Sequence, residues 1–159
     1  MIVKKIDSIE KAFHQVISKI CIVAIFIMTC IVFYSVIMRY IFKSAPFWGE
    51  EISRYILVWV SLLGASLAFS NREHAAVEYF TNKMSEKTQK MVTRFTDILS
   101  LIFFAYVIKY GIISAISGFR MVSPATGIKM FYPFLGIPIG CLACFIQILF
   151  NLIHSFKNE

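Results

Sequence analysis

The chain has 159 residues, of which 58% are hydrophobic and 16% charged, and it carries a formal net charge of +7. Soluble domains are closer to half apolar, and here the excess is gathered into four long blocks separated by short polar segments. This distribution excludes an ordinary soluble domain. The basic excess flanks the blocks, so it indicates membrane topology rather than a nucleic-acid surface.

Each of the four blocks reaches or approaches the ~20 apolar residues that a helix needs to cross the ~30 Å hydrocarbon core. They run from about 17–42, 52–70, 95–117 and 131–156. Backbone groups in lipid must be paired within their own segment, which favours helices. The blocks also lack the alternation over ~10 residues that is typical of β-barrel strands. We predict an all-α membrane protein, with residues 1–159 forming a single four-span membrane domain.

The segment before the first span is predicted to be an amphipathic helix. Its apolar residues recur at spacings of three and four, with lysines largely on the other side: Ile2, Ile6, Ile9, Phe13 and Val16. Such a stripe suits a helix that lies in the interface of the membrane. A plain cytoplasmic extension of the first span is the alternative, and the pattern does not separate the two.

The distribution of basic residues predicts the orientation. Ten of the 16 lie in the two termini and in the loop between the second and third spans, with its flanks, and six lie on the other side. The positive-inside rule then places both termini in the cytoplasm.

The loop between the first two spans carries several interpretable residues. Pro46 is expected to break the helix, and Trp48 lies at the depth of an aromatic belt. Glu50 and Glu51 fall in the first turn of the second span, where they complement the positive end of the helix dipole. Arg54 follows them by four and three residues, a spacing that predicts pairing with either.

Small residues indicate where helices approach one another closely. In the second span they are spaced three and four apart: Ser61, Gly64, Ala65 and Ala68. In the fourth span Gly136 and Gly140 form a GxxxG pair. Such faces pack against another helix, within the chain or in a partner.

One motif suggests a reaction, the pair Cys141 and Cys144 in a C-x-x-C arrangement. It would suit a four-helix membrane thiol or quinone oxidoreductase, which is the alternative function. Redox cysteines need access, yet Cys141 lies about ten residues into a span, about 15 Å deep. No cysteine lies in a loop to relay electrons. We therefore favour packing residues and predict no enzymatic activity, cofactor or metal.

A longer series of residues resembles the small integral membrane (Q, DctQ-like) subunit of tripartite ATP-independent periplasmic (TRAP) transporters. The series consists of Arg39-Tyr40-Ile41-Phe42, Phe47-Trp48-Gly49-Glu50-Glu51, Arg54, Trp59, Leu63-Gly64-Ala65, Ala68, Arg72 and His74, followed by the segments 123–129 and 138–140. The resemblance covers nearly the whole chain.

The resemblance implies a scaffold role in the bacterial inner membrane. A periplasmic substrate-binding protein would deliver a carboxylate-bearing solute, such as sialic acid or a C4-dicarboxylate. A large multi-span membrane subunit would carry the sodium and substrate sites and move as an elevator, and this chain would brace it. We expect a partner or phospholipid interface at Arg39, Trp48, Glu50, Glu51, Arg54, Trp59, Ser61, Gly64, Ala65, Ala68 and His74, although capping and anchoring explain the first turn of span two equally well. His74 is expected to order the cytoplasmic turn.

Overall fold

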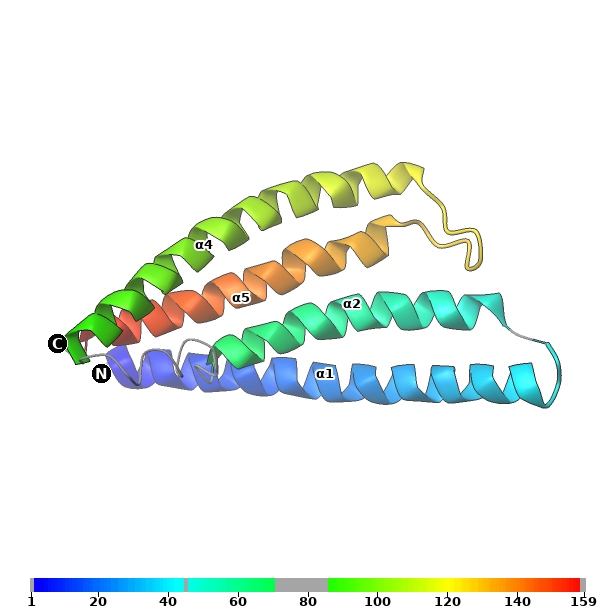
Figure 1. Ribbon diagram of the computed structural model, residues 1–159, viewed down its shortest axis with the longest axis horizontal. Helices are drawn as coiled ribbons and strands as arrows, with labels where there is room; N and C mark the ends of the chain where they lie inside the picture. Colours follow the sequence, from blue (N-terminus) through cyan, green and yellow to red (C-terminus); the bar gives the residue numbers. More distant parts are fainter. Residues whose placement is uncertain (1, 45, 71–85, 158–159) are drawn as a thin grey trace.

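The structure, a computed structural model, describes residues 2–44, 46–70 and 86–157 (Figure 1). Its helices are α1 (Ile2–Tyr40), α2 (Phe47–Ser70), α4 (Glu86–Ser117), the short 3-10 helix η1 (Gly118–Arg120) and α5 (Phe131–Lys157). The four α-helices are each long and apolar enough to cross a membrane. The prediction of an all-α, four-span membrane protein is confirmed.

α2 and α4 each begin before the spans predicted for them, and the local sequence explains where they begin. α2 begins at Phe47, directly after Pro46, whose ring permits a helix start but not a helix interior. α4 begins at Glu86 rather than near residue 95, because its polar first turns continue into the apolar span without a break.

α1 is a single helix of 39 residues. At 1.5 Å per residue it is about 58 Å long, roughly twice the thickness of the hydrocarbon core. The N-terminal segment therefore continues into the first span without a break. That its first turns lie along the membrane surface stays a prediction.

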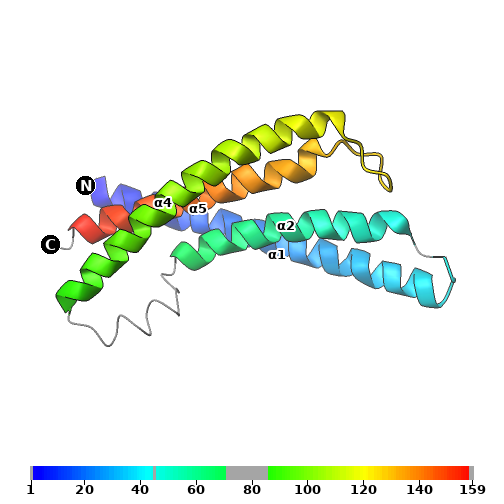
Figure 2. The same cartoon turned by 45° about the horizontal axis from the view of Figure 1, so that its top comes forward.

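The four helices form an open layer rather than a closed bundle. They lie in the row α1, α2, α5, α4 in Figure 1, and Figure 2 shows that the N-terminal part of α1 crosses over to α5. α5 is the most enclosed, with half of its most apolar stretch buried, against about a tenth or less for the other three helices. Both termini lie at one end of the layer, called here the termini end (Figure 1). The α1–α2 turn and the segment between η1 and α5 lie at the other, the loop end.

The GxxxG pair of α5 makes the contact with α2. A Cβ on Gly136 would lie 2.8 Å from the indole Nε1 of Trp59, and a Cβ on Gly140 would overlap the Cβ of Leu62. The absence of side chains at these two positions lets the helices approach closely, as small residues do in membranes. This pair therefore acts within the chain.

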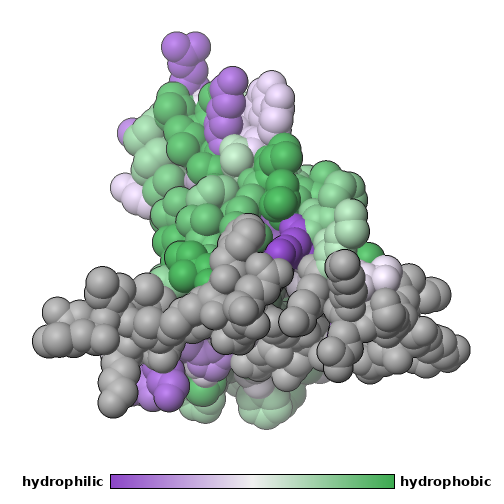
Figure 3. Space-filling model, turned by 90° about the vertical axis from the view of Figure 1, so that its left-hand side faces the viewer, coloured by the Kyte–Doolittle hydropathy of each residue, from purple (hydrophilic) through white to green (hydrophobic). Residues whose placement is uncertain are grey.

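Two apolar clusters complete the layer. One joins α1, α2 and α5 near the termini end and consists of Ile17, Cys21, Leu63 and Ala143. The other joins α4 to α5 and consists of Phe104, Cys141, Cys144 and Ile148. Phe69 of α2 adds an edge-to-face contact to Phe104, with ring centroids 5.5 Å apart. Beyond these clusters most large apolar side chains are exposed, and much of the surface seen from the termini end is hydrophobic (Figure 3).

Candidate functional site

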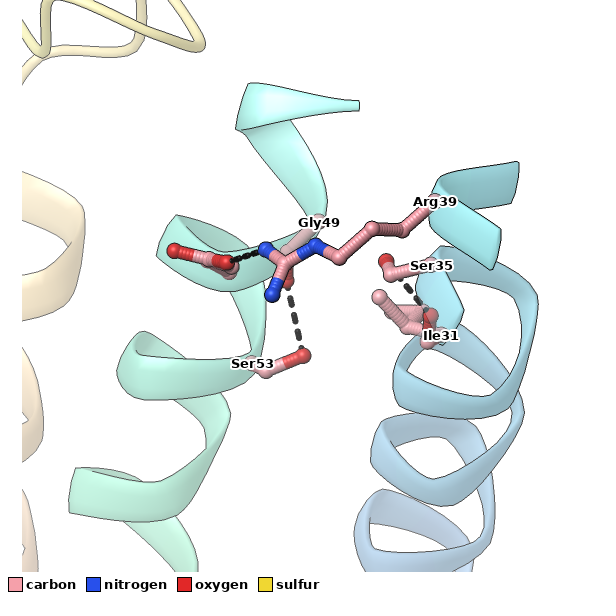
Figure 4. A network of polar contacts seen from close by, with 6 residues as sticks. Ile31, Ser35, Arg39, Gly49 and Ser53 are labelled. Carbon is pink, nitrogen blue, oxygen red and sulfur yellow. Dashed lines mark hydrogen bonds and ion pairs between the residues drawn. The ribbon is translucent and has the colours of Figure 1, made fainter. Parts of the chain in front are cut away.

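At the loop end, α1 and α2 are joined by an ion pair that sequence reasoning missed. Arg39 reaches across from α1 to the carboxylate of Glu50 (Figure 4). The approach is possible because position 49 is a glycine: a Cβ there would overlap the hydroxyl of Ser35. The predicted pairing of Arg54 with a neighbouring glutamate is wrong. Spacing along one helix suggested that partner, but Glu50 is bound by Arg39 of α1, and Glu51 is bound by Tyr55 of its own helix and by Ser123 from a distant segment.

Beside this ion pair, two serine hydroxyls donate hydrogen bonds to backbone carbonyls. Ser35 donates to the carbonyl of Ile31 and Ser53 to that of Gly49, each at 2.8 Å (Figure 4). The Arg39–Glu50 pair itself is solvent-exposed, with about half or more of each side chain accessible. Exposed pairs contribute roughly 0–1 kcal/mol, so it sets geometry more than stability.

Trp48 is exposed and stacks on Tyr34 of α1, with ring centroids 6.0 Å apart. Indole and phenol rings prefer the membrane interface. This arrangement agrees with the predicted anchoring role, and it adds a second contact between the outer turns of α1 and α2.

Glu51 is bound to the segment between η1 and α5. Its carboxylate accepts hydrogen bonds from the hydroxyls of Tyr55 and of Ser123, a residue 72 positions away. Ser123 is buried, and its oxygen also accepts from the backbone N–H of Thr126 at 3.1 Å. Sequence reasoning missed Ser123, because nothing local indicates which distant carboxylate will face it.

Residues 121–130 form a small hairpin, called here the 121–130 hairpin. Val122 and Lys129 face each other in an antiparallel bridge. The N–H of Ser123 donates to the carbonyl of Ile128 at 2.9 Å, and the N–H of Gly127 donates back to the carbonyl of Ser123 at 3.0 Å. Gly127 has φ +68°, a conformation that glycine adopts without steric cost. These contacts fix the shape of the loop.

The small residues of α2 divide between two surroundings. Ala65 packs against the α4–α5 cluster. Ser61 and Ala68 are exposed, and a Cβ added to Gly64 would meet nothing within 4 Å. Leu57, one turn before Ser61, is also exposed. Leu57, Ser61, Gly64 and Ala68 are called here the open face of α2.

The other broad side of the layer holds an apolar groove of about 540 Å³. Ile56 and Trp59 of α2 lie at its floor, between Ile20 of α1 and Leu135 of α5. Trp59 was expected at a partner interface. The structure places it against Gly136 and in the lining of this groove, so it packs within the chain, and its contact with a partner stays a prediction.

Buried polar groups connect the helices toward the termini end. Gln147 of α5 donates to the carboxylate of Glu10 in α1 at 2.7 Å, and Asn151 donates to the carbonyl of Phe69 in α2 at 2.6 Å. Both amides are at least nine-tenths buried. In apolar surroundings an unpaired amide is costly, so these bonds fix the register of α5 against its two neighbours.

The cysteine motif lies inside the layer. Cys144 is fully buried with its Sγ 3.6 Å from the carbonyl of Leu62, and Cys141 is 2% exposed. Both thiols pack in the α4–α5 cluster. His74, the last predicted site residue, lies outside the described residues.

Comparison with known proteins identifies the family. The profile of the DctQ component of tripartite ATP-independent periplasmic transporters matches residues 28–158. Two Haemophilus influenzae proteins, each named putative TRAP transporter small permease protein, are 30% and 28% identical over 93% and 95% of this chain, and the matches cover 86% and 92% of their own lengths. The sialic acid TRAP transporter permease protein SiaT of H. influenzae is 28% identical over 77% of the chain, a match that spans 20% of that longer protein.

The family is a membrane component of transporters and not an enzyme, which overturns the oxidoreductase alternative. The chain is accordingly a multi-pass protein of the inner membrane. On this evidence it belongs to the DctQ family, the small membrane subunits of TRAP transporters.

Proposed function

We propose that this chain is the scaffold subunit of a sodium-coupled TRAP transporter and braces a large membrane subunit that carries the substrate path. The observation that carries the proposal is the open layer. Its helices leave broad apolar faces uncovered, and the buried polar residues in the described part of the chain are uncharged: Ser66, Ser123, Gln147 and Asn151. Transport paths through membranes are usually marked by ionisable groups inside the protein. A layer built this way suits a support that packs against a partner.

Two relatives support the choice of partner. SiaT and the isethionate TRAP transporter permease protein DctMQ of Oleidesulfovibrio alaskensis match this chain over 20% and 21% of their lengths. In both, a segment similar to this chain is therefore part of a much longer permease polypeptide. We infer that the present chain packs against the corresponding large-subunit segment.

The open face of α2 is the proposed contact with that subunit. Lipid offers no hydrophobic drive for helix association, so close approach at small residues supplies much of the packing energy. Ser61, Gly64 and Ala68 leave such an approach open. Arg39, Glu50, Arg54 and Trp48 lie at the outer end of the same helix pair, where we propose contact with the large subunit or a phospholipid headgroup, and His74 is proposed to order the turn after α2.

The proposed orientation has both termini in the cytoplasm and the loop end in the periplasm. The structure supports it in part, since both termini lie at one end of the layer (Figure 1). The choice of side rests on the ten basic residues around the termini end against six at the loop end.

The proposed solute is a small organic acid, with sialic acid or a C4-dicarboxylate as first choices. Relatives from Vibrio cholerae are named for these two substrates, and they match 46% and 40% of this chain. Selection would rest on the periplasmic protein and the large subunit, and transport would run on a sodium gradient.

Co-purification tests the proposed function. Tagged chain, produced in its native cells, is expected to bring down a large multi-span membrane subunit in mild detergent at roughly equal amounts. Recovery of the tagged chain alone, folded and in good yield, would contradict a scaffold role.

Changing Cys141 and Cys144 together to serine is expected to leave solute uptake within about twofold of the parent. Serine keeps the size of cysteine, and in a helix its hydroxyl bonds to the preceding turn. Uptake and complex yield are measured in the same cells. Lost uptake in a fully assembled complex would show that the thiols act in transport.

A further inference from the structure

We propose that Glu51 is a positioning residue that clamps the 121–130 hairpin onto α2, and that the basic surface of this hairpin docks an acidic face of the soluble periplasmic partner. The inference rests on the proposed function for the side of the membrane and for the existence of such a partner. It assigns Glu51 a role that differs from helix capping or contact with the large subunit.

The first step is the clamp. The two neighbouring glutamates of α2 behave differently: Glu50 is exposed and paired with Arg39, whereas Glu51 is half-buried and binds two hydroxyls. Ser123 links Glu51 to the rest of the hairpin, because its oxygen also accepts from the N–H and the hydroxyl of Thr126, at 3.1 and 2.6 Å. A single carboxylate thereby holds a loop from the other half of the chain.

The second step is the position and shape of the hairpin. It extends beyond the start of α5 at the loop end in both ribbon views (Figures 1 and 2). Its cross-strand hydrogen bonds give it one conformation, with the N–H of Met130 donating to the carbonyl of Met121 at 3.0 Å. Such a preformed element loses little conformational entropy on binding.

The third step is charge. Six cationic residues and two carboxylates lie at the loop end, and both carboxylates are engaged as described. Of the six cations at this end, the described structure pairs only Arg39 with a carboxylate; the other five are Lys43, Arg54, Lys109, Arg120 and Lys129. The loop end is therefore positively charged. Arg120 directly precedes the hairpin, and Lys129 lies within it.

The fourth step is the kind of partner. Beside the two cations, Met121 and Val122 are more than half exposed, on a segment that projects past the adjoining ends of α4 and α5 (Figure 2). Arginine and methionine next to apolar side chains are typical of protein interfaces. Complementary charge would steer an acidic protein to this surface and make the encounter sensitive to salt. A soluble protein with an acidic face fits these features.

Binding of the periplasmic substrate-binding protein to the complete membrane complex tests the docking. The complex is held in phosphatidylcholine nanodiscs, and potassium chloride is raised at constant sodium, since sodium is the proposed coupling ion. The double variant Arg120→Glu with Lys129→Glu is expected to weaken binding at least tenfold at low salt and to flatten its salt dependence. Lys43→Glu, a reversal at the other loop, is the matched control and is expected to change affinity less than threefold.

Hydrogen exchange tests the clamp. Glu51→Ala and Ser123→Ala are each expected to speed exchange at residues 121–130 at least fivefold, without changing the central turns of α2 and α5, and to weaken binding of the soluble partner. Ser123→Thr keeps the hydroxyl and is expected to restore slow exchange. Glu50→Ala removes the other carboxylate and is expected to leave the hairpin unchanged.

The outcomes separate the two claims. If the wild-type chain brings down no large subunit, the proposed function fails and this inference fails with it. If the complex assembles but its affinity for the soluble protein is the same after charge reversal, only the docking fails. Weakened association with phosphatidylglycerol vesicles, with unchanged affinity for the soluble protein, would make the hairpin a lipid contact and would also overturn the docking.

Discussion

Replacing Ala68 by leucine on the open face of α2 is expected to reduce recovery of the large subunit at least tenfold, while this chain remains folded. The side chain at position 68 is exposed in the described structure, so leucine fits within the chain itself. In the complex, the leucine side chain would keep a helix of the large subunit from approaching closely. The van der Waals packing that drives helix association in lipid would then be lost. Gly64→Leu is expected to act in the same direction. The measurement is co-purification from membranes with equal amounts of tagged chain.

The matched control is Ala105→Leu, the same change at an exposed position of α4. It alters the apolar surface equally but lies outside the open face of α2. Equal loss of the large subunit in both variants would show that the open face has no special part in assembly. Full recovery of the large subunit with both variants would show that the interface lies on another surface of the chain.

Gly140→Ala is expected to destabilise the packing of α5 on α2. The added methyl would overlap the Cβ of Leu62, with the backbone carbon of Leu62 at 3.4 Å, so α2 itself must move. Overpacking of a well-packed site costs about 1–3 kcal/mol. Unfolding in detergent, followed by tryptophan fluorescence, is expected to show this loss because Trp59 lies one turn away, against Gly136.

Gly64→Ala provides the control for the same chemical change. Its Cβ meets open space, and alanine is favoured over glycine in helices by about 1 kcal/mol. We expect unchanged or slightly raised stability. Equal stability of the Gly140 and Gly64 variants would mean that the close α2–α5 contact is absent.

The sequence predicted the spans well because hydropathy over ~20 residues reports directly on the membrane. α2 begins at Phe47, directly after the predicted break at Pro46 and five residues before the predicted span. The order of helices in the layer could not be predicted, since apolar surface facing lipid and apolar surface facing protein have the same composition. Thus the sequence marks both Gly64 and Gly140 as sites of close helix approach. Only the structure shows that Gly140 contacts α2, whereas the space beside Gly64 is open.

The site was harder to predict for a related reason. Spacing along a helix identifies neighbours three or four residues apart, so Arg54 was assigned to Glu50 or Glu51. The structure gives Glu50 to Arg39 on α1 and Glu51 to Ser123, 72 residues away. Contacts of this kind depend on which helices lie side by side and on how closely glycine lets them approach.

Reconstituted uptake tests the central claim most directly. Proteoliposomes would contain the large subunit, this chain, or both, with the periplasmic protein outside, an inward sodium gradient and radiolabelled sialic acid or C4-dicarboxylate. A scaffold subunit predicts uptake only when both membrane proteins are present, and none above empty liposomes for this chain alone. Uptake by this chain alone, or full uptake by the large subunit without it, would contradict the account.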